Sequence, residues 1–346
     1  MCNIFKKSSF VILFIFLLTL TINKTNLIDI EGLYPIIYSF WYYILSNVFM
    51  YSSFAVGDIL YILFPIILVT YFYKFNRRRD RFYFLIKVPI ITYCIFYWSW
   101  GFNYQKKSDF KNLKNNYSLQ DLILTTEHYM SETNNLQIKI SGLKERKVES
   151  DLSFDQIKNE CVKSITNTNW VIKNKKITYF PVKKSLFSTP LSYMGFSGYI
   201  NPFTLEANIN YNIPKISMPL TISHEIAHQI GYAFEDEANF IAIKTLSNSN
   251  NHFLKYSGNL MAVQYLLAEI KKNDIEKYIF YVKNLNKGVK KNIEEKNDYF
   301  LEYQNKFEGF FKKNYDIFLK ANNQRAGIES YSMVVNLLIN NHQSKI

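Results

Sequence analysis

The residues of this sequence that are best suited to chemistry lie in one segment, PLTISHEIAHQIGYAFEDEANFIA (residues 219–242). His224 and His228 are four residues apart, one helical turn plus about 40°, so an α-helix projects both imidazoles from one face. That geometry suits two ligands of one zinc ion. Glu225 would be turned about 100° from His224 and would lie beside a metal-activated water as its general base.

A third metal ligand is expected shortly after the two histidines. Gly231 can take the left-handed conformation that ends a helix, so that a second helix would begin near Glu235. Glu235 falls on the same face of that helix as Ala238 and Ala242, which we expect to be buried. Glu237 points roughly the other way. We therefore predict Glu235 as the third ligand, with Glu237 as the alternative.

A zinc ion held by His224, His228 and Glu235 would keep one coordination position open for water, as catalytic zinc sites do. Such water loses a proton near neutral pH, and Glu225 would accept that proton as the water attacks a polarised carbonyl. Hydrolysis of peptide bonds is the reaction that these parts predict, with a peptide or protein as the substrate.

Other side chains would have to support this reaction. An oxyanion donor is needed, and Tyr199, Tyr256 and Tyr331 are unranked alternatives for it. Asn239 or Asp236 would orient the histidines.

Several stretches of the chain share residues with a known family. They are GDILY (57–61), WGFNY (100–104), GYINPFTLEAN (198–208), GIESY (327–331) and, in the zinc segment, His224, Glu225, Ala227, His228, Gln229, Gly231, Glu235, Glu237, Ala238 and Asn239. On these residues the chain resembles the bacterial domain of unknown function 3810, a membrane-anchored family grouped with the gluzincin type of HExxH zinc metallopeptidases. The resemblance implies a zincin-like fold and a peptidase-like site, and it supplies no substrate.

The resemblance also implies how a substrate is held, although this chain departs from the zincin patterns in two respects. Residues 207–210 would present backbone groups to an extended peptide, the alternative being an ordinary edge strand. The interval from His228 to Glu235 is much shorter than in the better-known gluzincins. The HExxHxxG portion also resembles metzincins, but their third histidine would fall at Phe234, which cannot bind metal.

Apolar runs ahead of these motifs predict a membrane anchor. Residues 54–73 and 82–102 are each long enough to cross a bilayer as a helix. Residues 8–22 form a shorter uncharged run without a small-residue cleavage site after it, which favours an uncleaved anchor. Residues 33–53 are rich in aromatic and hydroxyl side chains, which is typical of the membrane interface.

Basic residues predict the orientation of these spans. Lys6, Lys7 and the stretch KFNRRRDR (74–81) all lie on the cytoplasmic side if three segments cross. The chain after Tyr104 would then lie outside the cytoplasm of a bacterial inner membrane. If residues 33–56 also crossed, the arginine-rich stretch would face outward, against the positive-inside rule. We therefore predict three crossings.

The expected fold is of the α+β class, with a membrane anchor over residues 1–104 and an extracytoplasmic zincin-like domain over 105–346. Within that domain, residues 118–135 predict a helix with Ser118 as its N-cap, whereas 170–182 and 198–212 are typical of β-strands. The chain after the zinc segment is helical in pattern to its end. The domain should be mostly helical with a small sheet.

Composition limits the partners. The net charge is +13, but the lysines are scattered among asparagines without the concentrated patch of a nucleic-acid module, so we expect no nucleic acid. Solubility, or attraction to anionic lipid headgroups, accounts for the charge. The three cysteines, Cys2, Cys94 and Cys161, predict no disulfide. The oligomeric state and the cleavage specificity have no signature in the sequence.

Two other functions compete with that of a zinc metalloendopeptidase. A catalytically inactive, zinc-stabilised membrane scaffold that binds partners would have no need of Glu225. A transport or sensing role would need charged residues in the spans, where only Asp58 and Lys87 occur. The alternative kept open is the scaffold.

Overall fold

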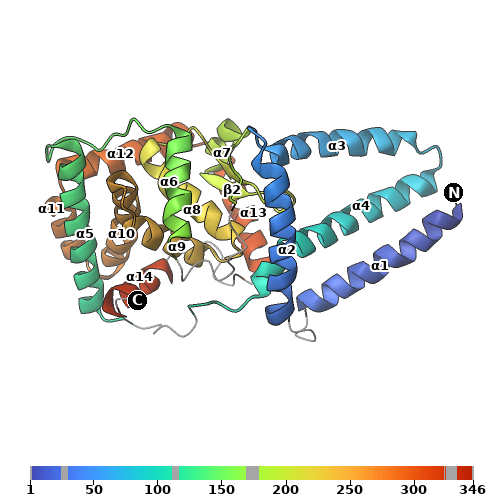
Figure 1. Cartoon of the computed structure of the whole chain (residues 1–346), viewed down its shortest axis with the longest axis horizontal. Helices are drawn as coiled ribbons and strands as arrows, with labels where there is room; N and C mark the ends of the chain where they lie inside the picture. The colour runs from blue at the N-terminus through green and yellow to red at the C-terminus, as the bar shows by residue number, and fades with distance from the viewer. Residues whose placement is uncertain are drawn as a thin grey trace.

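The computed structural model describes residues 2–24, 30–110, 117–168, 179–322, 324 and 333–344. The described chain is mostly helical with one three-stranded sheet, as the predicted α+β class requires. Long helices project from one end of a larger body that holds the sheet and most of the helices (Figure 1). Tyr331 with the GIESY motif (327–331), and residues 170–178 of one predicted strand, lie outside the described residues.

The projecting part consists of α1 (Cys2–Lys24), α3 (Val56–Lys74) and α4 (Arg78–Ser99), with the N-terminus at its tip (Figure 1). Helices α3 and α4 are long and apolar enough to cross a membrane, and they overlap the predicted spans 54–73 and 82–102, although α4 ends at Ser99 and the chain continues as a 3-10 helix. The described apolar stretch of α1 runs from Phe10 to Lys24 and is shorter. A crossing by residues 8–22 stays a prediction.

Helix α2 (Ile30–Met50) covers all but the last three residues of the predicted interfacial segment (33–53) and runs across the base of the projecting helices (Figure 1). Tyr34, Tyr38 and Tyr42 follow one another at four-residue intervals and are buried on one face. The Tyr38 hydroxyl donates a hydrogen bond of 2.8 Å to the backbone carbonyl of Gln229, which ends a helix of the body. On the opposite face, large apolar side chains such as Phe40 are exposed.

The start of α3 is fastened to the sheet by two buried carboxylates. Glu206 accepts hydrogen bonds from the backbone amides of Val56, at 3.1 Å, and Gly57, at 2.6 Å. These amides belong to the first turn of a helix, where they have no partner within the helix and favour a negative charge. Asp58 accepts a hydrogen bond of 3.1 Å from the Asn208 side chain. The acid that the sequence places in a span therefore lies inside the protein.

The sheet has the strand order β1-β3-β2. Strand β1 (Val182–Lys184) pairs in parallel with β3 (Ala207–Ile209), and β2 (Gly198–Ile200) pairs with β3 in the antiparallel sense. Strand β3 is buried and paired on both sides. The expectation that residues 207–210 present their backbone to a substrate is therefore wrong, and so is the alternative of an ordinary edge strand, because β3 is the central strand and no edge is free there. Among the described strands, β2 lies at the edge next to α8.

Helices make up the rest of the body. They are α5 (Leu119–Ser141), α6 (Phe154–Thr166), α7 (Ser188–Met194), α8 (Met218–Gln229), α9 (Glu235–Ser247), α10 (His252–Asn273), α11 (Ile275–Asn284), α12 (Lys287–Glu302), α13 (Glu308–Ala321) and α14 (Met333–Ser344), with 3-10 helices at Gly101–Gln105 and Lys215–Ser217. The predicted N-cap is confirmed, because the Ser118 hydroxyl accepts a hydrogen bond from the Asp121 amide at the start of α5.

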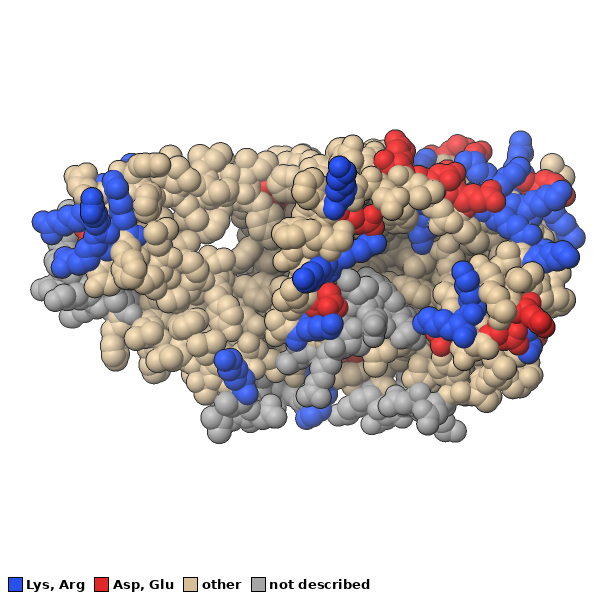
Figure 2. All heavy atoms as spheres, turned by 180° about the vertical axis from the view of Figure 1, so that it is seen from behind, with Lys and Arg blue, Asp and Glu red and all other residues tan. Residues whose placement is uncertain are grey.

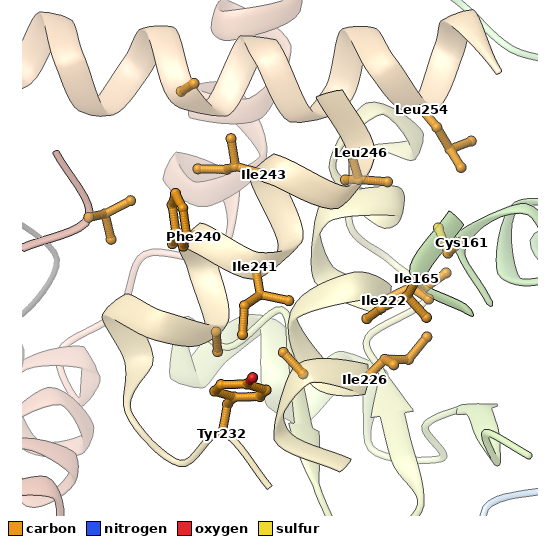
Figure 3. Packing of buried hydrophobic residues seen from close by; sticks show 14 of the residues in the cluster. Cys161, Ile165, Ile222, Ile226, Tyr232, Phe240, Ile241, Ile243, Leu246 and Leu254 are labelled. Atoms are coloured by element: carbon orange, nitrogen blue, oxygen red, sulfur yellow. The ribbon is translucent and has the colours of Figure 1, made fainter. Parts of the chain in front are cut away.

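The core that positions α8 and α9 is mostly aliphatic, with the aromatic rings of Tyr232 and Phe240 packed at α9 (Figure 3). Ile222 and Ile226 of α8 and Ile241 of α9 are fully buried. Cys161 of α6 is buried in the same core with a free thiol, and burial raises its pKa to about 12, which makes it inert. Close packing of this kind resists deformation and holds the backbone of α8 in a fixed position against α9.

Candidate metal centre

A tight turn returns the chain from α8 to α9. Gly231, between the two helices, has a φ of 93°, in the left-handed region that suits glycine. A Cβ atom at this position would also come within 2.9 Å of the Asn103 Oδ1 atom and within 2.6 Å of the Lys106 Nζ atom. The predicted role of Gly231 is confirmed, and α9 begins at Glu235 as expected.

The turn brings Glu235 to the two histidines. The Nε2 atoms of His224 and His228 are 3.0 Å apart. Glu235 Oε2 lies 3.3 Å from His224 Nε2, and Oε1 lies 3.6 Å from His228 Nε2. One ligand atom from each residue falls within 4.8 Å of the others. These three buried or half-buried groups could hold a metal ion, and two imidazoles with one carboxylate are a donor set typical of catalytic zinc.

Glu237, the alternative third ligand, lies outside this group. It is buried, and burial raises its pKa to about 7. Burial alone would raise the pKa of Glu235 as well, but hydrogen bonds from His224 and His228 outweigh burial and hold that pKa well below its usual value. Burial lowers the pKa of His228, yet Glu235 outweighs it and raises that pKa to about 9. Glu235, and not Glu237, is thus the carboxylate that interacts with the two histidines.

The remaining ring nitrogens of the histidines are held by the protein. His224 Nδ1 lies 3.1 Å from Asn239 Oδ1, and His228 Nδ1 lies 2.7 Å from the carbonyl oxygen of Tyr232. If Nδ1 donates in each case, both Nε2 atoms present lone pairs to the same point. Asn239 is itself held by its bond to the Glu235 carbonyl at 2.8 Å. Of the two residues expected to orient the histidines, Asn239 makes this contact.

Glu225 lines the same cavity as the three candidate ligands. Its side chain is buried, and its Oε2 atom has no hydrogen-bond partner among the described residues. A buried acceptor without a partner costs about 1–3 kcal/mol. Burial raises the pKa of Glu225, although the charges of the two histidines act against this. Glu225 thus brings a buried carboxylate with one unsatisfied oxygen to the wall of the cavity.

Strand β2 passes directly over Glu225. A Cβ atom at Gly198 would lie 3.0 Å from Glu225 Oε1 and 3.0 Å from Thr221 Cγ2. Only glycine lets the strand come this close without displacing the glutamate. The edge of the sheet is therefore adjacent to the candidate general base.

The tyrosines predicted as oxyanion donors lie elsewhere or have other partners. Tyr256 is buried in α10 and donates a hydrogen bond of 3.0 Å to Asn292. Tyr199 lines the cavity, but its hydroxyl donates to Asp58. Tyr331 lies outside the described residues.

Two other tyrosines lie next to the candidate metal ligands. Tyr315 of α13 donates a hydrogen bond of 2.7 Å to Glu235 Oε1. Tyr265 of α10 lines the cavity, and its pKa is raised by burial and by the negative charge of Glu235. Sequence reasoning missed both, because nothing local to α10 or α13 marks a residue that faces α9.

The metal centre opens into a cavity of about 840 Å³. Its wall includes the candidate ligands, Glu225, strand β2 and many aromatic side chains from distant helices. Trp100 belongs to this wall, and its indole N–H donates a hydrogen bond of 3.3 Å to the His228 carbonyl. Trp100, the first residue of the WGFNY motif (100–104), is therefore bonded to the C-terminal turn of α8.

Comparison with known protein families places this chain in a family. A family model described as "Protein of unknown function (DUF3810)" matches residues 31–339. The matched range runs from α2 to α14 and includes the whole metal centre. No curated protein and no solved structure matches this chain.

Proposed function

We propose that this chain, which belongs to the DUF3810 family, is a membrane-anchored zinc metallopeptidase. One observation carries the proposal: His224, His228 and Glu235 converge on one point, and the same cavity is lined by Glu225, whose Oε2 atom has no hydrogen-bond partner among the described residues. A purely structural metal site needs neither an acid beside it nor a large cavity in front of it.

The proposed chemistry divides between the metal and the chain. A bound zinc ion would polarise a carbonyl and make water a nucleophile near neutral pH. Glu225 would take the proton of that water at its free Oε2 atom and pass it to the leaving amine. Asn239 and the Tyr232 carbonyl would keep both histidines in the tautomer that leaves Nε2 free. Tyr265, kept protonated by its raised pKa, would donate to the developing oxyanion.

The substrate backbone would be held by β2. An extended peptide can add to the edge of a sheet through main-chain hydrogen bonds. At β2 such a peptide would run past Glu225, because Gly198 is in contact with that side chain. This assignment replaces residues 207–210 in the role of the substrate-binding strand.

The membrane anchor is part of the same proposal. Helices α1, α3 and α4 would cross the bilayer, and α2 would lie in its surface with Phe40 and the neighbouring apolar side chains in lipid. Figure 2 shows basic side chains at the tip of the projecting helices and an uncharged band between that tip and the body. With the arginine-rich stretch (74–81) in the cytoplasm, the body would lie outside it. A reporter fused after residue 346 tests this, because activity of the reporter in the cytoplasm contradicts it.

The test of catalysis compares three full-length proteins in lipid nanodiscs: wild type, Glu225→Gln and His224→Ala. The full chain is used because α2, α3 and α4 supply partners to the body. We expect wild type and Glu225→Gln to bind zinc equally, His224→Ala to lose it, and only wild type to cleave a peptide library. Zinc content is measured by elemental mass spectrometry. Zinc binding without cleavage by wild type would favour the inactive scaffold.

A further inference from the structure

We infer that the substrate is an extended, apolar segment of a membrane-anchored polypeptide, which reaches the metal centre from the side of α3 and α4. The inference rests on the proposed peptidase function and names the substrate class of that site.

Its first support is the origin of the cavity wall. Tyr61 of α3 and Phe96 of α4 line the same cavity as His224 and Glu225. These two helices are the ones long and apolar enough to cross a membrane. Tyr61 lies near the start of α3 and Phe96 near the end of α4, both at the ends close to the body. The cavity therefore lies where the bilayer surface would meet the body.

The second support is the chemistry of the wall. Aromatic side chains gather on the side of the anchor: the Tyr61 ring packs edge-on against Phe203 and Phe96 packs edge-on against Phe318, and all four line the cavity. On α3 the next side chain, Ile62, is 45% exposed, so apolar surface continues from the cavity to the outside of the helix. Figure 2 shows a gap through the uncharged band close to the body. Such a wall stabilises apolar side chains and disfavours a hydrated peptide.

The third support distinguishes a polypeptide from a lipid. An acyl chain would fit an aromatic wall, but it has no backbone N–H or C=O groups for the edge of β2. The contact between Gly198 and Glu225 brings that edge to the candidate general base. An extended chain with apolar side chains uses both the edge and the wall. We therefore commit to a polypeptide.

The experiment traps the substrate and measures its distance from the membrane. A photo-crosslinking amino acid replaces Tyr61 in Glu225→Gln protein, with a matched control at Tyr73, which is 71% exposed near the opposite end of α3. Both proteins are placed in vesicles of phosphatidylethanolamine and phosphatidylglycerol. The probe is a model polypeptide with one leucine-alanine span of about 20 residues followed by an extended flank rich in Phe and Leu. A second probe has a polar spacer between span and flank, and a third is the soluble flank alone.

We expect the Tyr61 position, and not the Tyr73 position, to crosslink to the flank of the anchored probe. Wild type should cleave that flank close to the span, and the spacer should reduce cleavage at least about ten-fold by lowering the local concentration of the flank. Equal cleavage with and without the spacer, or a crosslink to phospholipid alone, overturns the inference. If zinc-loaded wild type cleaves no peptide at all, the proposed peptidase function is wrong. The crosslink then still tests whether an anchored polypeptide binds at Tyr61.

A different observation carries a second inference. Lys296 of α12 lines the cavity, where its Nζ atom lies 2.9 Å from Gln264 Oε1 and 3.4 Å from Met261 Sδ. Among the described residues no carboxylate lies within ion-pair distance of it. We propose that Lys296 binds a carboxylate of the substrate. The Lys296 side chain is partly buried, and an ammonium withdrawn in part from water without a counter-ion is costly, so an anionic ligand would supply the missing partner. Burial lowers the pKa of Lys296 to about 8, which agrees with the missing counter-ion.

The test compares Lys296→Met and Lys296→Arg with wild type on three peptides: one with a free C-terminal carboxylate, its amide, and an amide with an internal Glu. We expect Lys296→Met to raise KM at least about ten-fold for one of the two anionic peptides, with kcat and the KM of the neutral amide unchanged. Lys296→Arg should restore part of the loss. Whichever anionic peptide is affected shows whether Lys296 binds the C-terminal carboxylate or the Glu side chain of the substrate. Equal changes for all three peptides overturn the assignment.

Discussion

The Tyr315 hydroxyl donates a hydrogen bond of 2.7 Å to Glu235 Oε1. Tyr315 belongs to α13 and Glu235 to the first turn of α9, so a helix near the end of the chain fixes the carboxylate that completes the candidate metal centre. The bond leaves Glu235 Oε2 directed at His224, 3.3 Å away. Orientation of this kind matters because a ligand that is already in place loses less freedom when the metal binds.

Tyr315→Phe should therefore weaken zinc binding without changing the fold. We expect a loss of about 10-fold in affinity, at the lower end for a group that orients a ligand. Competition with a chromogenic chelator measures it, and Tyr303→Phe, a tyrosine outside the cavity wall, is the control. An unchanged affinity in Tyr315→Phe would mean that Glu235 is held in place by its other contacts.

Gly198→Ala should impair catalysis and spare the metal. The new Cβ atom would lie 3.0 Å from Glu225 Oε1 and must displace that side chain or the strand. We expect kcat to fall at least about 100-fold, the lower range for losing a general base, while zinc content stays the same. Gly309→Ala is the matched control, because a Cβ atom there meets nothing within 4 Å. Full activity in Gly198→Ala would show that β2 has room to move.

Glu206→Gln should destabilise the junction of α3 with the sheet. The buried carboxylate accepts from the Gly57 amide at 2.6 Å and from the Thr204 hydroxyl at 2.9 Å. The neutral amide keeps one acceptor and loses the favourable charge at the helix start, for an expected cost of about 1–3 kcal/mol. Denaturant unfolding in detergent measures this. Without α3, residues 105–346 alone would leave the Glu206 side chain without the Val56 and Gly57 amides and would expose surface that the full chain covers. This fragment should therefore be less soluble and less stable than the full chain.

Zinc affinity should fall as the pH falls. In the metal-free protein the pKa of His228 is raised to about 9, so below that pH zinc must displace a proton. We expect the apparent affinity to drop about ten-fold per pH unit between pH 8 and 6 if one proton is displaced.

The effect of pH on the folding stability of the metal-free protein has the opposite sign. The stability contributed by protonated His228 is complete below the unfolded pKa of about 6.5 and is lost as the pH rises through about 9. Zinc should therefore raise the Tm more at pH 8 than at pH 6.

Much of the candidate site could be predicted because its signals are local. The spacing of His224 and His228 decides which face of one helix they share, and Gly231 marks where that helix ends. The apolar face of the next helix pointed to Glu235, which the structure brings to the histidines. Uninterrupted apolar runs likewise indicated α3 and α4.

The sequence by itself thus determined the paired imidazoles, their neighbouring acid, the third candidate ligand and the apolar helices, because each depends on residues within a few turns of one another. Only the tertiary structure decided that β3 lies in the middle of the sheet and β2 at the edge beside α8, that Tyr315 holds Glu235, and that Tyr61 and Phe96 share a cavity with the candidate metal centre. These relationships join segments far apart in the chain. Their residue types are common in any core, so no local pattern distinguishes them before the elements pack together.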